Sequence, residues 1–213
     1  MLKSIIETIY MLFLSMLIAS LIGIPLGISM SVSKKGGIKE NLVYHKIVDI
    51  LIINITRSIP FIILIVLLIP LSRFLVGKSY GTTAFIIPLA IATAPFISRI
   101  IESSLNEVDK GLIEMGISIG AKPKDIILKI LIPEAMPSII NGLTLTLISL
   151  VSYIAMAGVV GGGGLGNEAI IKGYQRGNKE IMYVATIYIV VIVQIIQYFG
   201  TKIVKKIEKK RGK

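Results

Sequence analysis

Long runs of hydrophobic residues alternate with short polar segments along this chain of 213 residues. A helix needs roughly 20 apolar residues to cross a bilayer whose hydrocarbon core is about 30 Å thick. Five runs reach that length, and we expect them at residues 4–32, 48–69, 82–101, 138–160 and 181–204. The pattern therefore predicts an all-α integral membrane protein, with five transmembrane helices in one domain that covers residues 1–213.

Composition supports this class and narrows the possible partners. Hydrophobic residues make up 54% of the chain, whereas about 45–50% is usual in a soluble domain. The net charge of +11 would suggest nucleic acid in a soluble protein, but here the lysines cluster beside apolar runs, so we expect lipid contact and no nucleic acid. There is no cysteine, and His45 is expected to be a solvated loop residue, so no metal site is predicted.

The distribution of positive charge predicts the orientation. Most lysines and arginines lie in residues 33–49, residues 99–137 and the tail after residue 202, which share one side of a five-span chain. The positive-inside rule places this side in the cytoplasm, so the N-terminus is expected outside and the C-terminus inside. The first run is longer than the 7–15 residues of a signal-peptide core and contains Glu7, so we do not expect it to be cleaved.

Residue choice within the runs predicts what each face contacts. Small residues recur every four positions in the first run, at Ser15, Ala19, Gly23 and Gly27, a spacing that lets another helix approach closely in lipid. The second run contains Arg57 and Pro60, which suggests a helix broken inside protein or beside a water-filled cavity. Alternatively, the Arg57 side chain extends towards the cytoplasmic surface.

The fourth run carries a polar arc. At 100° per residue one side of this helix holds Asn141, Thr146, Ser149, Ser152 and Tyr153. A polar arc on a spanning helix faces the bundle or a translocation pathway, because lipid cannot satisfy it. The alternative is that the serines and threonines only join helices through hydrogen bonds.

Residues 102–137 form a long amphipathic segment between the third and fourth runs. Gly120 suits a left-handed turn, and Pro123 suits the first turn of a new helix, where its missing N–H costs nothing. The segment therefore predicts a helix–turn–helix on the cytoplasmic side, with a shape that fits a groove on a partner.

Here the chain resembles a known family. Residues 114–133 read EMGISIGAKPKDIILKILIP, and they resemble the cytoplasmic EAA signature of ATP-binding-cassette (ABC) importer permeases, with Glu114, Gly120, Ile130 and Pro133 in register. Met115 and Gly116 replace the two alanines of that signature, and Ile132 replaces its leucine. Residues 54–66, 94–99 and 131–137, and Tyr153–Met156 leading into Gly161–Gly166, are similar to the methionine branch of these permeases.

The resemblance implies a type I ABC importer permease, a homodimer in the bacterial cell membrane with a cytoplasmic coupling helix. Its implied partners are two copies of an ATPase subunit and an extracytoplasmic substrate-binding lipoprotein, and its implied substrates are L- and D-methionine. ATP would bind the partner, so this chain is expected to bind no cofactor and not to be an enzyme. The residues implied in ATPase coupling are Glu114, Met115, Gly116, Gly120, Ala121, Lys122, Pro123 and Asp125. Those expected at the pathway or gate are Met156, Tyr153, Ser152, Ser149 and Asn141, while Arg57, Pro60, Pro133 and Pro137 are expected to shape the helices.

Four other interpretations were open at this point. The run Gly161–Gly166 lacks the Gly-Lys-Ser/Thr end of a phosphate-binding loop, so we expect a flexible turn that permits close backbone approach. An ion-coupled carrier commonly has an acidic residue at mid-membrane, but Glu7, Asp49 and Glu102 lie near run ends. A non-transporting membrane scaffold is a further alternative, although it would leave the polar arc of the fourth run unexplained. A permease for another amino acid, glycine betaine or a phosphonate is also an alternative, because the external binding protein sets much of the specificity in this family.

Overall fold

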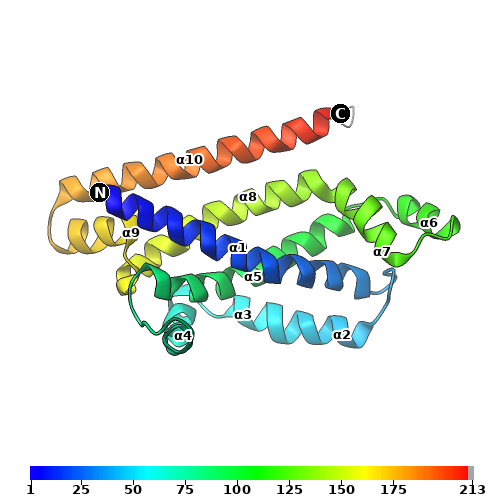
Figure 1. The fold of residues 1–213 in the computed structure, drawn as a ribbon, viewed down its shortest axis with the longest axis horizontal. Coiled ribbons are helices and arrows are strands. Elements are labelled where there is room, and N and C mark those ends of the chain that lie inside the picture. The colour runs from blue at the N-terminus through cyan, green and yellow to red at the C-terminus, as the bar shows by residue number, and fades with distance from the viewer. Residues whose placement is uncertain (211–213) are drawn as a thin grey trace.

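The computed structural model describes residues 1–210, and this part of the chain consists of helices without strands (Figure 1). The α-helices and the wider π-helical segments (η) follow one another closely. In chain order they are α1 (Leu2–Ser33), α2 (Leu42–Ile47), η1 (Val48–Asn54), α3 (Ile55–Ser58), α4 (Phe61–Val76), α5 (Thr82–Asn106), α6 (Lys110–Ser118), α7 (Pro123–Asp125), η2 (Ile126–Leu131), α8 (Ile132–Ala157), η3 (Gly158–Gly162), α9 (Gly164–Gly166), η4 (Asn167–Gln175) and α10 (Lys179–Lys210).

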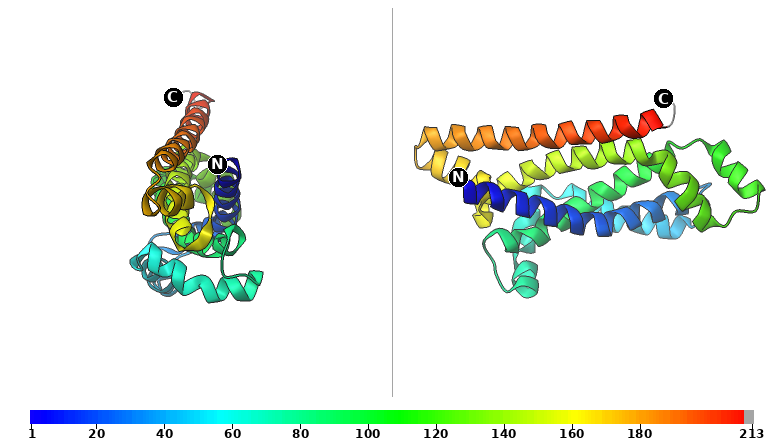
Figure 2. Two further views of the ribbon diagram at one scale, coloured as in Figure 1. Left: turned by 90° about the vertical axis from the view of Figure 1, so that its left-hand side faces the viewer. Right: turned by 45° about the horizontal axis from the view of Figure 1, so that its top comes forward.

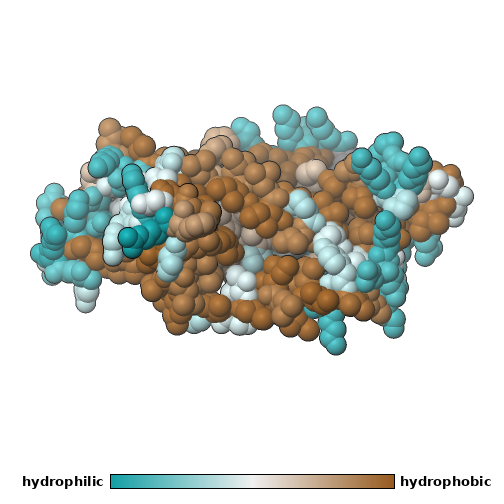
Figure 3. All heavy atoms as spheres, turned by 60° about the horizontal axis from the view of Figure 1, so that its bottom comes forward, coloured by the Kyte–Doolittle hydropathy of each residue, from teal (hydrophilic) through white to brown (hydrophobic). Residues whose placement is uncertain are grey.

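Within residues 1–210, four helices are long and apolar enough to cross a membrane: α1, α5, the continuous helix Pro123–Gly162, and α10. A fifth candidate span is broken. Its halves, Leu42–Ser58 and Phe61–Val76, pass the same test together but meet at an angle of 108°. The surface carries a broad hydrophobic band with hydrophilic residues gathered towards both ends, as a membrane protein requires (Figure 3).

Helices α1 and α5 pack against each other through the small residues that the sequence pattern singled out. Ser15, Ala19, Gly23 and Gly27 are all buried. A Cβ atom on Gly23 would lie 2.7 Å from the carbonyl oxygen of Ala94, and one on Gly27 would collide with the carbonyl oxygen of Ser98. The prediction of close helix approach along this stripe is therefore confirmed.

Helix α5 forms the centre of the bundle. Its residues Phe85 and Leu89 pack with Met11 of α1 and Leu150 and Ile154 of α8 in one buried cluster. Nearer the other end of α5, a second cluster includes Ile97, Ile101 and Leu105 together with Ile126 and Leu131 of η2. By contrast, α10 lies on the outside of the chain with little of its surface covered, and contacts α8 where Gly200 meets Thr144 (Figure 2).

The three basic segments lie at the same end of the molecule, as the charge pattern predicted. The connection between α1 and α2, the α6–α7 corner and the C-terminal end of α10 are together at one end (Figures 1 and 2). The N-terminus, α9 and η4 lie at the opposite end. We call these the basic end and the N-terminal end.

The region between the third and fourth runs differs from the expected layout. Helix α5 continues to Asn106, and the helix that begins at Pro123 runs through Pro133 and Pro137 into α8 without a break. A proline inside a helix removes one backbone hydrogen bond and crowds the carbonyl four residues earlier. The π-helical turns of η2, directly before Pro133, provide a wider backbone that accommodates it.

Candidate functional site

The corner at the basic end is built from local turn chemistry. Helix α6 begins at the cap residue Asp109, whose carboxylate accepts a 2.6 Å hydrogen bond from the Gly111 N–H. It ends where Gly120 adopts a left-handed backbone with φ of 74°, which glycine allows without strain. The N–H of Ala121 then bonds the carbonyl oxygen of Gly116 at 3.0 Å, and Pro123 starts the next helix. The predicted helix–turn–helix is confirmed.

One face of this corner holds it against the bundle. Gly116 is buried, and a Cβ there would lie 3.0 Å from Cδ1 of Ile130, so α6 lies directly on η2. The buried side chain of Ile126 packs between this corner and α5. Lys129 and Asp125 form an ion pair of 2.7 Å on the outer side.

The other face of the corner is exposed and partly apolar. Met115 is 54% exposed, Ile117 56% and Ile119 76%, although they lie beside lysines at a polar end of the molecule. Glu114, Lys122 and Pro123 are exposed on the same corner. Exposed apolar side chains grouped with charges are typical of a surface that contacts another protein or the membrane. We call this set the docking corner.

The break in the second span lies at Ile59 and Pro60. Ile59 has the extended backbone (ψ 125°) that a following proline favours, and Pro60 then caps α4. The predicted broken helix is confirmed. The Arg57 side chain is exposed and its guanidinium lies 5.0 Å from the centre of the Phe96 ring on α5, which is compatible with the alternative in which it extends towards the cytoplasmic surface.

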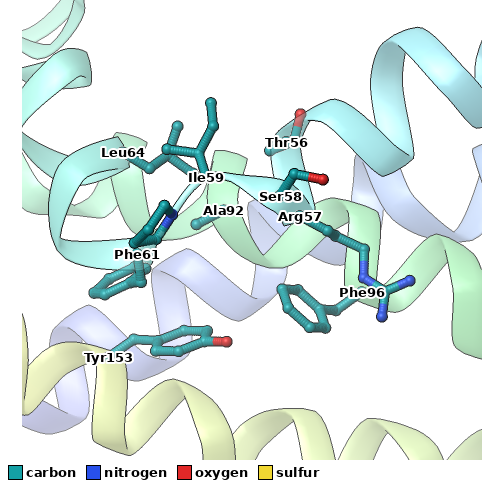
Figure 4. A pocket seen from close by; sticks show the side chains of 10 residues that line it. Thr56, Arg57, Ser58, Ile59, Phe61, Leu64, Ala92, Phe96 and Tyr153 are labelled. Carbon is teal, nitrogen blue, oxygen red and sulfur yellow. The ribbon is translucent and has the colours of Figure 1, made fainter.

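A cavity of about 230 Å³ opens beside this break. Phe61 and Tyr153 stack in its wall with ring centres 4.2 Å apart, and Phe96 tilts against Tyr153 at 6.3 Å (Figure 4). Its lining comes from the broken span, α5 and α8: Thr56, Arg57, Ser58, Ile59, Pro60, Phe61, Leu64, Ala92, Phe96 and Tyr153. We call it the bend cavity.

Ion pairs fix the half of the broken span that precedes the bend, Leu42–Ser58, to α5. Arg99 donates to Asp49 of η1 and, at 2.7 Å, to Glu102 one turn further along α5. His45 is not a solvated loop residue as predicted. It lies in α2, with Nδ1 3.1 Å from the Met30 carbonyl oxygen and Nε2 3.9 Å from Glu102, because α2 folds back along α1.

The polar arc of α8 points away from the rest of its own chain. Asn141, Ser149, Ser152 and Met156 are exposed, whereas Leu150, Val151 and Ile154 are buried in the bundle. Thr146 is buried and bonds the Gly142 carbonyl, and Tyr153 is half-buried in the wall of the bend cavity. Ser149 donates to the Leu145 carbonyl of its own helix at 3.0 Å, but lipid cannot satisfy the exposed Asn141 side chain, so this face requires water or another protein chain.

The N-terminal end has a different construction. The first turns of α1 bind the glycine-rich run: Glu7 accepts from the Gly164 N–H and Thr8 from the Leu165 N–H, each at 2.9 Å. Ser4 donates to Glu168 at 2.8 Å, which also pairs with Lys172. A Cβ at Gly166 would collide with the carbonyl oxygen of Ala155. The predicted close backbone approach is therefore confirmed, but the run is partly helical and held by α1 rather than a flexible turn. We call this region the N-terminal clasp.

The geometry of a spanning bundle with an exposed corner agrees with a family comparison. The model of the family described as "Binding-protein-dependent transport system inner membrane component" matches residues 23–209. This chain belongs to that family. The resemblance that the EAA-like motif suggested is thereby confirmed, and the family places the chain in an inner membrane.

Individual members of this family are similar over nearly the whole chain. A Vibrio cholerae protein named "Probable D-methionine transport system permease protein MetI" is 46% identical over 202 residues, which cover 95% of this chain and 89% of that protein. The "Methionine import system permease protein MetP" of Bacillus subtilis is 46% identical over 178 residues, 84% and 80% of the two chains. A chain from a structure of inward-facing conformations of the MetNI methionine ABC transporter superposes with a TM-score of 0.92 at 43% identity, covering 94% and 93%.

Sequence reasoning predicted the turn geometry of the docking corner, but it identified only part of the bend cavity. It singled out Arg57, Pro60 and Tyr153, and missed Phe61 and Phe96. An aromatic residue directly after each proline, in Pro60-Phe61 and Pro95-Phe96, was the available signal. Ile117 and Ile119 of the docking corner were also missed. Among residues 1–210, no group of three or more acidic or histidine side chains is placed to hold a metal ion.

Proposed function

We propose that this chain is the membrane permease subunit of an ATP-driven methionine importer that accepts both enantiomers. The observation that carries the proposal is the 46% identity, over 95% of the chain, to a protein named as a D-methionine permease. The docking corner supports an ABC transporter in particular, because an ion-coupled carrier has no need of a cytoplasmic surface for a motor. Glu7, Asp49 and Glu102, which lie near span ends, are each paired, which argues in the same direction.

The exposed surfaces fit a set of partners. Two copies of an ATPase subunit would each hold one docking corner, through the exposed Met115, Ile117 and Ile119 with Glu114 and Lys122 around them. A second copy of this chain would cover the polar arc of α8, which then lines a pathway on the dimer axis. A substrate-binding lipoprotein would deliver methionine at the N-terminal end, which lies outside the cell in this orientation.

Alternating access would follow from how the chain is connected. The corner continues as one helix from Pro123 through α8 to a kink at Val160 and Gly161, so a displacement at the corner passes along the whole of α8. Met156 lies exposed near that end and would act at the gate, while Ser149, Ser152 and Tyr153 would line the route. ATP would bind and be hydrolysed on the partner, and this chain would convert that motion into opening and closing.

The main test is transport by the purified complex. The chain is co-expressed with its ATPase subunit, reconstituted into proteoliposomes and supplied with its binding protein. We expect the ATPase subunit to co-purify, and labelled L- and D-methionine to enter the vesicles only when ATP is hydrolysed. Uptake driven by an ion gradient without ATP, or selective uptake of another solute, would contradict the proposal.

The orientation can be tested with single cysteines, because the natural chain contains none. A cysteine at Lys122, in the docking corner, should react only after a membrane-impermeant thiol reagent has access to the cytoplasm. A cysteine at Asn178, in the turn before α10, should react from outside intact cells. The reverse pattern would refute the proposed topology.

A further inference from the structure

Arg57 is an exposed cation within the broken span, and it has no acidic partner among the described residues. Among residues 1–210, no carboxylate lies within ion-pair distance of its guanidinium, and its one specific contact is the ring of Phe96. Phe96 is 10 residues from the Asn106 end of α5, about 15 Å along the helix axis, so the guanidinium lies beside the apolar body of this spanning helix. Ionisable groups at such depth are costly and mark substrate or ion pathways.

A second copy of this chain would not supply an unpaired carboxylate for Arg57 either. The acidic residues within or beside the spans that reach towards the core are already engaged. Glu7 accepts from the Gly164 N–H, whereas Asp49 and Glu102 both pair with Arg99. The guanidinium of Arg57 is therefore available to bind an anion that enters from solution.

The walls of the bend cavity define what kind of anion fits. Arg57 supplies the only charged side chain in the lining of this cavity, while Phe61, Phe96, Leu64 and Ala92 are apolar and the remaining polar groups are hydroxyls and backbone. Its volume of about 230 Å³ lies below the roughly 300–1,000 Å³ typical of drug-sized ligands, so it suits a small solute. A guanidinium pairs a carboxylate through two parallel hydrogen bonds.

We propose that the bend cavity is a transient binding site for the substrate amino acid, in which Arg57 binds the α-carboxylate and the stacked rings of Phe61 and Tyr153 contact the side chain. The inference rests on the proposed function for the substrate class, since methionine combines a carboxylate with an apolar side chain. The bend itself creates the site, because it places Arg57 and Phe61 four residues apart on two different helices that meet at the cavity (Figure 4).

The test measures binding to the permease–ATPase complex in lipid nanodiscs, without the binding protein, whose own site would otherwise dominate. Two probes are compared: L-methionine, and L-methioninol, in which a hydroxymethyl group replaces the carboxylate. In the natural complex we expect methionine to bind about tenfold or more tightly than methioninol, as charge-assisted hydrogen bonds predict. Arg57→Gln should reduce methionine affinity by about the same factor and leave methioninol unchanged, so that the discrimination disappears.

Arg73→Gln is the matched control, because Arg73 is an exposed arginine on α4 of the same broken span and does not line the bend cavity. It should bind both probes as the natural chain does. If Arg57→Gln fails to fold, Arg57→Lys keeps the charge and should bind methionine several-fold more weakly with methioninol unchanged. Equal loss of both probes in an Arg57 variant, or unchanged methionine binding in Arg57→Gln, would overturn the site.

The two proposals fail in different ways. A natural complex that imports no methionine with its binding protein contradicts the proposed function. A natural complex that imports methionine but binds methionine and methioninol equally well, or whose Arg57→Gln variant still discriminates between them, contradicts only the carboxylate site.

Discussion

Gly120 of the docking corner and three glycines of the N-terminal clasp have opposite roles. At the docking corner, Gly120 has a left-handed backbone with nothing within 4 Å of the position a Cβ would take. At the N-terminal clasp, Gly158, Gly162 and Gly166 pack so tightly that a Cβ would meet backbone atoms at each. The first glycine shapes a turn that stands free for a partner, and the others allow the chain to press against itself. The number of glycines in a segment therefore does not show whether that segment is mobile or tightly packed.

The largest effect is expected when the clasp is disturbed. Gly166→Val places its Cβ against the carbonyl and Cα of Ala155, which are backbone atoms that cannot move aside. We expect a loss of about 3 kcal/mol or more in the free energy of unfolding, and little protein in the membrane. Detergent-solubilised protein yield and thermal unfolding followed by circular dichroism measure this. A stable, abundant variant would show that the clasp can rearrange, and that the contrast between the two ends is smaller than the packing indicates.

The matching change in the docking corner should impair function rather than folding. Gly120→Val puts a β-branched residue at φ of 74°, which costs about 1–2 kcal/mol but creates no collision. We expect insertion into the membrane to persist, while ATP-driven uptake falls by more than about tenfold because the docking corner no longer fits its partner. Gly36→Val is the control, since Gly36 has φ of 71°, equally open surroundings, and lies in another turn at the basic end. Equal loss of uptake in both variants would contradict a specific role for the corner.

This contrast also explains what the sequence could predict. The docking corner depends on neighbours in the chain: Asp109 caps α6, Gly120 turns the backbone and Pro123 starts the next helix, so local rules were sufficient. The pairing of α1 with α5 was half predicted, since the four-residue spacing of small side chains marks a contact face without naming its partner.

Distant contacts were beyond such rules. The clasp joins Glu7 to Gly164 and Thr8 to Leu165, pairs that are 157 positions apart, and the wall of the bend cavity joins Phe61 to Tyr153. No local pattern encodes such pairs. The continuous helix through Pro133 was also not predicted, because the π-helical turns that accommodate the proline are set by packing of η2 against α5 and α6.

A moderate effect is expected from the hydrogen bond that Thr8 supplies to the clasp. Thr8→Val keeps the shape of the side chain but leaves the Leu165 N–H buried without an acceptor, which costs about 1–3 kcal/mol. Thr8→Ser retains the hydroxyl and should stay within about 1 kcal/mol of the natural chain, as a control for the lost methyl group. Thermal unfolding of the purified complex measures both. If valine and serine variants melt at the same temperature, the clasp is held by packing rather than by this bond.

The smallest expected effect concerns pH and Glu168, whose carboxylate joins the clasp to α1. Burial alone would raise the pKa of Glu168, but the hydrogen bonds from Lys172 and Ser4 outweigh it, aided by the charges of Lys172 and the N-terminal amine, so the pKa lies below its ordinary value. Because the folded-state pKa is below the unfolded one, ionised Glu168 stabilises the protein above the ordinary carboxyl range, and this contribution is lost as the pH falls through the folded-state pKa.

Melting temperatures measured between about pH 6 and about pH 3 test this linkage. We expect the natural complex to lose stability on acidification, and Glu168→Gln to lose less, by a difference of about 1 kcal/mol or less. Glu180→Gln is the control, because Glu180 is exposed at the start of α10 and its loss should leave the acid dependence as it is. If both variants follow the natural curve, Glu168 lies in the clasp without contributing to its stability. The hydrogen bonds of Glu7 and Thr8, together with the packed glycines, would then account for the stability of the N-terminal clasp.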